Sequence, residues 1–195
     1  HSQTETENIE ALQEVFEILR KNNLKLRADK TELLTKMVKF CGFIIKNGQK
    51  MPSNEKIEAI QNLQPPKNKA SAQSIFGLLN YHRTFIPNFA SKATAITKAY
   101  RGEFEWTKEA QKSLENLKTE VGQAALKLQI PNMKEAQFIL ETDASHNGYG
   151  AVLFICQQKS LHAHHGPNCL RPVEYASGMF SPSQLKYQTM EKELF

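Results

Sequence analysis

Residues 138–156 read FILETDASHNGYGAVLFIC and contain two strand-like runs separated by a short polar segment. The runs at 138–142 and 150–156 have the length and the apolar content of β-strands. Between them, residues 145–148 have the composition of a tight turn. We therefore expect two consecutive strands here, and a third at 171–175 after a long loop.

The segments on either side of these strands have helical periodicity, with apolar residues every three or four positions. Residues that cap helices, or prolines that stop them, mark most of their ends. The expected helices are about 6–21, packed through one apolar face; one that begins at Pro52 and Ser53 and stops at Pro65 and Pro66; one that begins at Ser71; a short one at 91–100; one capped by Thr107; and 183–195.

Two shorter β-like runs lie near the start of the chain. Residues 38–45 are followed by Asn47 and Gly48, a pair that favours a two-residue hairpin turn because both positions need a positive φ. Residues 24–27 alternate between apolar and basic side chains, as an edge strand does. The sequence therefore predicts a hairpin, and an edge strand before it.

Composition excludes several classes of protein. No apolar run approaches the ~20 residues that cross a bilayer, so we expect no membrane association. The chain has three cysteines, Cys41, Cys156 and Cys169, without a C-x-x-C pair, which argues against a disulfide framework and a zinc ribbon. A reducing, intracellular setting fits this composition best.

Positive charge is concentrated in the middle of the chain. The net charge is +5, and residues 67–101 contain no acidic residue. Cations and aromatic side chains together suit a nucleic-acid backbone, although a solvated helical face has the same composition. The basic residues of this segment are Lys67, Lys69, Arg83, Lys92, Lys98 and Arg101, and its aromatic residues include Tyr81 and Phe85.

Two carboxylates are candidates for chemistry. Asp143 ends the first strand, where it would either start the turn through its own side chain or hold a hard divalent cation. Glu193 lies in the last helical segment, where glutamates beside lysine are usually solvated. Spacing alone does not separate these alternatives.

Five blocks in order resemble the reverse transcriptases of gypsy-class LTR retrotransposons: residues 40–43 (FCGF), 77–90 (GLLNYHRTFIPNFA), 104–107 (FEWT), 142–145 (TDAS), and Tyr187 with 191–194 (EKEL). The resemblance implies an α+β fold that contains the end of a polymerase palm with its primer-grip hairpin, a helical thumb, and the N-terminal half of an RNase H-like α/β domain. The implied boundaries are 1–51 for the palm and hairpin, 52–103 for the thumb, 104–135 for a connecting segment, and 136–195 for the RNase H-like domain. Cys41 stands where the family usually has Leu, so we expect a small buried thiol there.

The resemblance also implies residue roles. Asp143 and Glu193 match the first two catalytic ligands of RNase H, which would bind Mg²⁺ or Mn²⁺. The expected partners are an RNA/DNA hybrid and a DNA duplex as template-primer, in the cytoplasm, a virus-like particle or the nucleus. The residues expected to contact nucleic acid are Phe40, Gly42, Lys67, Lys69, Tyr81 and Arg83.

Both active sites are expected to be incomplete in this chain. In the family, the polymerase aspartates would precede His1 and two further nuclease ligands would follow Phe195. The parent activities would be RNA-directed DNA polymerase and RNase H, and the competing interpretation is a domesticated, non-catalytic module that binds nucleic acid or protein. We also expect Tyr187, Met190 and Leu194 to form one apolar stripe on the sheet, with Glu193 at its border near Asp143 and Glu191 pointing outward.

Overall fold

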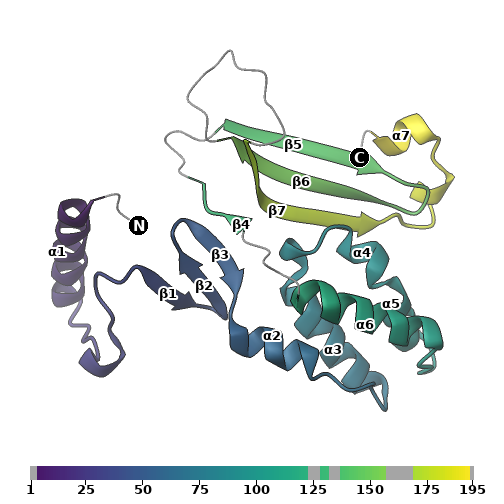
Figure 1. The fold of residues 1–195 in the computed structure, drawn as a ribbon, viewed down its shortest axis with the longest axis horizontal. Helices are drawn as coiled ribbons and strands as arrows, with labels where there is room; N and C mark the ends of the chain where they lie inside the picture. The colour runs from purple at the N-terminus through teal and green to yellow at the C-terminus, as the bar shows by residue number, and fades with distance from the viewer. Residues whose placement is uncertain (1–3, 123–127, 132–136, 157–168, 194–195) are drawn as a thin grey trace. The chain divides into compact units, whose positions relative to one another are not determined.

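The structure is a computed structural model that describes residues 4–122, 128–131, 137–156 and 169–193. It divides into two compact units, His1–Val38 and Lys39–Phe195. The elements drawn in Figure 1 are, in order, α1 (Glu5–Lys21), η1 (Ala28–Lys30), β1 (Met37–Phe40), β2 (Phe43–Lys46), β3 (Gln49–Pro52), α2 (Asn54–Gln61), α3 (Lys69–Tyr81), η2 (Arg83–Phe85), α4 (Phe89–Lys92), α5 (Thr94–Arg101), α6 (Lys108–Gly122), β4 (Leu128–Gln129), β5 (Gln137–Ala144), β6 (Gly148–Cys156), β7 (Leu170–Met179), η3 (Gln184–Lys186) and α7 (Thr189–Glu193).

The first unit is built on α1, as the periodicity predicted. The Thr4 side chain caps the helix by accepting a hydrogen bond from the Glu7 backbone N–H at 3.2 Å. Acidic residues occupy the first turn and basic residues the last, which suits the helix dipole. The expected packing of one apolar face is wrong, because no residue of α1 is buried and Phe16 is 40% exposed.

Residues 24–27 do not form the expected edge strand. A strand is defined by a hydrogen-bonded neighbour, and within the described residues none pairs with this segment. Arg27 instead makes an ion pair with Asp29, at 2.6 Å, beside the short helix η1.

The expected hairpin is confirmed in β2 and β3, which pair antiparallel with Ile44 opposite Met51. Asn47 and Gly48 have φ values of 52° and 70°, as the two-residue turn requires. Residues 41 and 42 form a second turn between β1 and β2, with φ values of 47° at Cys41 and 75° at Gly42. Cys41 is exposed at this turn, so the expectation of a buried thiol is wrong.

Capping residues explain where the helices of the second unit begin. Ser53 caps α2, and the Thr107 hydroxyl accepts a hydrogen bond from the Ala110 N–H at 3.2 Å at the start of α6. In α3 the capping residue is Asn68, which accepts from the Ser71 N–H at 2.9 Å while the Ser71 hydroxyl accepts from the Asn68 N–H at 3.1 Å. Ser71 is therefore the N3 residue of a capping box. The helix begins three residues earlier than expected, because Asn68 rather than Ser71 is its N-cap.

Two segments expected to be continuous helices are interrupted. The segment at 91–100 is divided into α4 and α5 at Ala93, which is buried. The segment at 183–195 is divided into η3 and α7 at Tyr187, which has an extended backbone with φ −67° and ψ 147°. The side chains of Tyr187 and Met190 therefore do not belong to one helical stripe.

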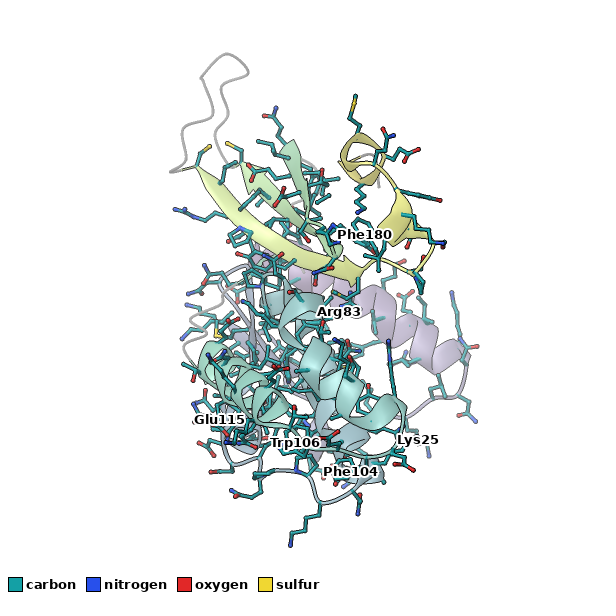
Figure 2. All side chains as sticks on the ribbon, turned by 90° about the vertical axis from the view of Figure 1, so that its right-hand side faces the viewer. Lys25, Arg83, Phe104, Trp106, Glu115 and Phe180 are labelled. Atoms are coloured by element: carbon teal, nitrogen blue, oxygen red, sulfur yellow. The ribbon has the colours of Figure 1, made fainter. Side chains whose placement is uncertain are left out.

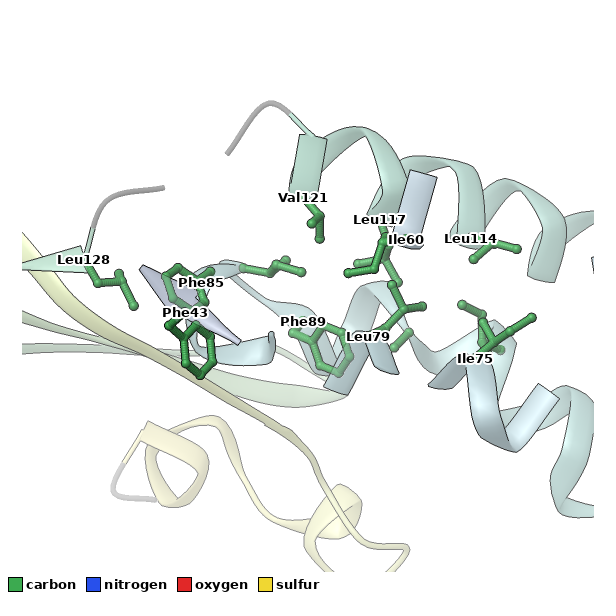
Figure 3. Packing of buried hydrophobic residues seen from close by; sticks show 13 residues of the cluster. Phe43, Ile60, Ile75, Leu79, Phe85, Phe89, Leu114, Leu117, Val121 and Leu128 are labelled. Atoms are coloured by element: carbon green, nitrogen blue, oxygen red, sulfur yellow. The ribbon is translucent and has the colours of Figure 1, made fainter. Parts of the chain in front are cut away.

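The core of the second unit lies among its helices (Figure 3). Apolar side chains from α2, α3, α5 and α6 meet those of η2, α4, β2 and β4 in one cluster. Its members are Phe43, Ile60, Ile75, Leu79, Phe85, Ile86, Phe89, Ala93, Ile96, Leu114, Leu117, Val121 and Leu128.

His82 is packed into the edge of this cluster and is fully buried. Its ring lies edge-on to Phe43, with centroids 5.7 Å apart, and neither of its ring nitrogens has a hydrogen-bond partner among the described residues. Burial, helped by the charges of Lys56 and Lys50, lowers the pKa of His82 to about 4.

Strands β5, β6 and β7 form an antiparallel sheet, which confirms the three strands expected from the sequence. The sheet is tied to the helices through β7. Arg83 donates a hydrogen bond to the Ser177 carbonyl at 2.9 Å, and the Ala90 N–H donates to the Ser177 hydroxyl at 3.0 Å. Figure 2 shows Arg83 between the helices and the sheet.

Candidate functional site

Asp143 lies near the end of β5 and is exposed. Its cross-strand neighbour on β6 is Gly150, whose own neighbour on β7 is Ser177. Directly opposed residues of an antiparallel sheet share one face, so the three form a row on the face that meets η2 and α4. Asp143 borders two cavities on this face, of 190 and 240 Å³.

The helical region contributes Asn88 to the same two cavities. Asn88 has left-handed backbone angles, φ 53° and ψ 35°, immediately before α4. A Cβ atom added to Gly150 would lie 2.5 Å from the Asn88 Oδ1, so the glycine leaves the space that this carboxamide occupies. Sequence reasoning missed Asn88, and the signal available was an Asn after Pro87, where left-handed angles are common for Asn.

The first cavity has the donor chemistry of a hard cation site. Apart from the Met179 thioether, its heteroatom-bearing side chains carry oxygen or amide groups, supplied by Asn88, Ser91, Asp143, Ser145, Asn147, Tyr149 and Ser177. Carboxylate, amide and hydroxyl oxygens suit Mg²⁺, Mn²⁺ or Ca²⁺. Among the described residues, however, no group of three His, Cys, Asp or Glu side chains comes together, so Asp143 is the only described carboxylate at this cavity.

Glu193, the other expected ligand, is the last residue of α7, and its side chain lies outside the described part of the structure. Its approach to Asp143 therefore stays a prediction. Leu194 of the expected stripe also falls outside the described residues. Glu191 has a structural role, since its carboxylate accepts a hydrogen bond from the Gln188 N–H at 2.8 Å and so closes the start of the helix.

The face by which α7 packs differs from the expected one. Met190 is 81% exposed, whereas Lys192 is 7% exposed. The Lys192 ammonium donates to the His146 carbonyl at 3.3 Å and lies 5.8 Å from the centre of the Phe180 ring. A lysine stem covers apolar surface while its charge reaches a polar partner, and the periodicity of apolar residues alone does not reveal this.

A second candidate surface lies where the 41–42 turn meets α3. The Tyr81 hydroxyl donates a hydrogen bond to the Cys41 carbonyl, and the Tyr81 ring stacks on Phe43 at 5.1 Å. A groove of 440 Å³ runs beside this contact. It is lined by Cys41, Gly42, Lys56, Gly77, Leu78 and Tyr81.

The residues expected to contact nucleic acid do not all gather at this groove. Gly42 and Tyr81 line it, and Phe40 is 62% exposed at the end of β1. Lys67 and Lys69 are exposed at the opposite end of α3, ~18 Å from Tyr81 by helical rise. Lys56, which sequence reasoning missed, supplies the positive charge of the groove.

The basic segment is partly neutralised within the protein. Lys92 makes an ion pair with Glu120 at 2.7 Å, and Arg83 uses one nitrogen to bind the Ser177 carbonyl. Lys67 and Lys69 have no ion pair among the described residues, so their charges face solvent. The positive charge available to a ligand is therefore smaller than the composition indicated.

The family model of the RNase H-like domain found in reverse transcriptase matches residues 106–195 of this chain. Over 98% of its length the chain is also 34% identical to the Retrovirus-related Pol polyprotein from transposon 412 of Drosophila melanogaster. It is 29% identical over 100% of its length to the Transposon Tf2-3 polyprotein of Schizosaccharomyces pombe. The resemblance to gypsy-class retrotransposon reverse transcriptases is thus confirmed.

Solved structures resemble the chain over its whole length. The foamy viral protease-reverse transcriptase dRH, in complex with double-stranded DNA, has a TM-score of 0.81 and 26% identity, and the match covers 100% of this chain and 33% of that one. The foamy viral protease-reverse transcriptase in complex with RNA/DNA hybrid has a TM-score of 0.78 and 25% identity over 100% of this chain and 25% of that one. The chain spans 15% of the transposon 412 polyprotein and 14% of the Tf2-3 polyprotein. No helix in the described ranges is long and apolar enough to cross a membrane.

Proposed function

We propose that this chain is the part of a retroelement reverse transcriptase that holds the template-primer duplex and carries the first ligands of the RNase H site. In this proposal residues 1–51 are the end of the palm with its primer grip, and 52–103 the thumb. Residues 104–135 connect them to the N-terminal half of the RNase H-like domain, 136–195. The parent protein would act inside the cell, in the cytoplasm, a virus-like particle or the nucleus.

The observation that carries the duplex-holding role is the groove at the 41–42 turn. Tyr81 joins the turn to α3, and a close approach by a phosphate or sugar is open at Gly77, where an added Cβ would meet nothing within 4 Å. Lys56 supplies a cation on the wall of the groove. The foamy viral structures bound to double-stranded DNA and to RNA/DNA hybrid support the same role.

Binding of a labelled RNA/DNA hybrid to the 195-residue chain, followed by fluorescence anisotropy at two salt concentrations, tests this role. We expect affinity without sequence preference that falls as salt rises, because each neutralised phosphate releases counterions. Replacing Lys56, on the wall of the groove, with Gln should reduce the slope of log K against log salt by about 1. Replacing Lys67 and Lys69 with Gln should reduce it by about 1 to 2.

The matched control is the double substitution of Lys108 and Lys112 with Gln, which removes the same charge from exposed positions on α6. It should leave the slope nearly unchanged. Equal losses in the two double variants would show that only net charge matters, and an affinity insensitive to salt would contradict the proposal.

We propose that Asp143 and Glu193 bind a divalent cation, Mg²⁺ or Mn²⁺, in the complete nuclease. Held by these two carboxylates, such an ion would supply the means to activate water and to stabilise the leaving oxygen of the RNA strand. The oxygen donors around Asp143 fit such an ion, and Asp143 holds its place through the ladder of β5 with β6. Loss of cation binding in Asp143→Asn is the expected result, whereas hybrid binding without any cation binding at Asp143 would favour a non-catalytic module.

We further propose that these 195 residues alone neither extend a primer nor cleave a hybrid, since they supply only two of the four carboxylates that the family's nuclease uses. An assay of the purified chain with Mg²⁺ and with Mn²⁺ checks this. Cleavage that disappears in Asp143→Asn would contradict it.

A further inference from the structure

The carboxamide of Asn88 is the feature near Asp143 that the proposed function does not yet use. Asn88 belongs to the loop before α4, whereas Asp143 belongs to β5, and 55 residues of sequence separate them. Both line each of the two cavities on this face of the sheet. Two side chains from distant parts of the chain thus border the same polar space.

We propose that Asn88 supplies its carboxamide oxygen to the cation site that Asp143 begins, so that the loop before α4 is part of the nuclease site. The inference rests on the proposed cation-binding role of Asp143. It assigns Asn88 as a ligand of the ion, or as a partner of a water molecule on it, in addition to the carboxylates of the RNase H-like domain.

The space around Asn88 is built for this side chain. Gly150 lies directly across from Asp143 in the sheet, and an added Cβ there would come within 2.5 Å of the Asn88 Oδ1. Such a separation is too short for a real contact, so any other residue at position 150 would displace the carboxamide. Gly150 does not have a positive φ. A glycine is therefore needed at this position for the space it leaves, and not for its backbone freedom.

Within the described residues, Asn88 and Asp143 make no side-chain hydrogen bond and no ion pair, whereas the Ser145 and Ser177 hydroxyls beside them both accept backbone hydrogen bonds. Both are exposed on the cavity rather than buried. A carboxylate and an amide oxygen that face one open cavity without a partner are donors that a hard cation can use.

The backbone of Asn88 is anchored beside the cavity. Left-handed angles are accessible to Asn and Gly but disfavoured for most residues, and the ends of the loop are held by the buried residues Ile86 and Phe89. The ligand is therefore presented by a short, anchored loop, which suits a site that must hold its geometry.

Mn²⁺ titration of the ¹⁵N-labelled 195-residue chain, followed by paramagnetic broadening of NMR signals, tests the inference without an activity assay. Signals of the Asn88 side-chain NH₂ and of the Asp143 and Gly150 backbone amides should broaden first. In Asn88→Gly, which keeps the left-handed backbone and removes the carboxamide, the affinity measured at Asp143 should fall about 10-fold, as when partners of metal ligands are lost. Asn88→Asp should bind Mn²⁺ more tightly, because a carboxylate replaces a neutral oxygen; a purely structural role would not produce that gain.

Asn47→Gly is the matched control, since Asn47 also has a left-handed backbone, at φ 52°, but lies at the β2–β3 turn. It should leave Mn²⁺ binding unchanged. Gly150→Ala should weaken binding in the same direction as Asn88→Gly, and Asn88→Gly decides the matter if the alanine variant does not fold.

The outcomes separate this inference from the proposed function. If Asp143→Asn abolishes the local broadening while Asn88→Gly and Asn88→Asp leave it as in the original chain, Asn88 is not part of the site and the role of Asp143 stands. If Asp143→Asn itself changes nothing, the cation-binding role of Asp143 fails, and the assignment of Asn88 fails with it.

Discussion

The helices of the second unit and the β5–β7 sheet differ in how completely they bury their apolar side chains. Leu79, Leu114 and Leu117 in the helices are fully buried, whereas Leu140 on the sheet is 64% exposed. The polar cavities and Asp143 lie at the sheet. The comparison indicates that the helices carry most of the stability of this unit, while the sheet carries the candidate chemistry.

Truncating a leucine in each region should break this comparison if it is wrong. Leu79→Ala should lower the free energy of unfolding of the second unit by about 2–5 kcal/mol, because it leaves a cavity in the helical core. Leu140→Ala should lower it by less than about 1 kcal/mol, since that side chain is mostly in water. Urea titration followed by the fluorescence of Trp106, the single tryptophan, measures both. Equal losses would mean that the sheet contributes as much to the free energy of unfolding as the helices do.

The pH dependence of stability sharpens the comparison through two histidines. The pKa of His82 is about 4 in the folded chain, below its ordinary 6.5. Between these two pH values the unfolded chain is protonated at His82 and the folded chain is not. The contribution of His82 is therefore complete above pH 6.5 and is lost as the pH falls toward 4, by about 3 kcal/mol in all.

His82→Leu should remove this part of the pH dependence, measured as the difference between urea titrations at pH 7 and pH 4.5. His146→Leu is the control, because His146 is exposed at the β5–β6 turn. A pH dependence that survives in His82→Leu would mean that other groups cause it.

The joint between the two regions should respond to Ser177→Ala. The substitution removes the acceptor of the partly buried Ala90 N–H, so it should lower the free energy of unfolding by about 1 kcal/mol. Ser74→Ala, at an exposed position of α3, should cost nothing measurable. Amide hydrogen exchange should show faster exchange at Ala90 in the first variant only; unchanged protection there would show that the hydroxyl does not hold the joint.

The smallest expected effect concerns the two turns that flank β2. Cys41 and Asn47 have similar left-handed angles, but only Asn47 is a residue that favours them. Cys41→Asn should therefore raise the free energy of unfolding by about 0.5–1 kcal/mol, measured by urea titration. Asn47→Cys should lower it by a similar amount, and a loss of stability in Cys41→Asn would mean that the thiol has a packing role.

The sequence predicted helix starts and turns well where a residue interacts only with its neighbours along the chain. Thr107, Ser53 and the Asn47–Gly48 pair act through their own backbone neighbourhood, and each is found in its expected role. Ser71 was misplaced because Asn68 competes for the same cap three residues earlier. The error was therefore one of position within a motif rather than of the kind of element.

The site was harder to predict because it depends on which faces meet. Asp143 could be placed on a strand by its alternation, but its meeting with Asn88 arises only when β7 packs on η2 and α4. The packing of α7 through Lys192 rather than Met190 likewise depends on the His146 carbonyl, a backbone group with no sequence signature. The periodicity of apolar residues does not predict tertiary contacts of this kind.

The pairing of Asn88 with Gly150 and of Arg83 with Ser177 also bears on how such elements evolve. Retroelements that exchange segments by recombination could join the helices of one parent to the sheet of another. A crossover between residues 90 and 150 would separate both pairs, and an alanine in place of Gly150 would collide with the incoming carboxamide. Viable crossovers should therefore fall outside this interval, or bring together parents that already match at Asn88 and Gly150, because any residue at position 177 supplies the carbonyl that Arg83 binds.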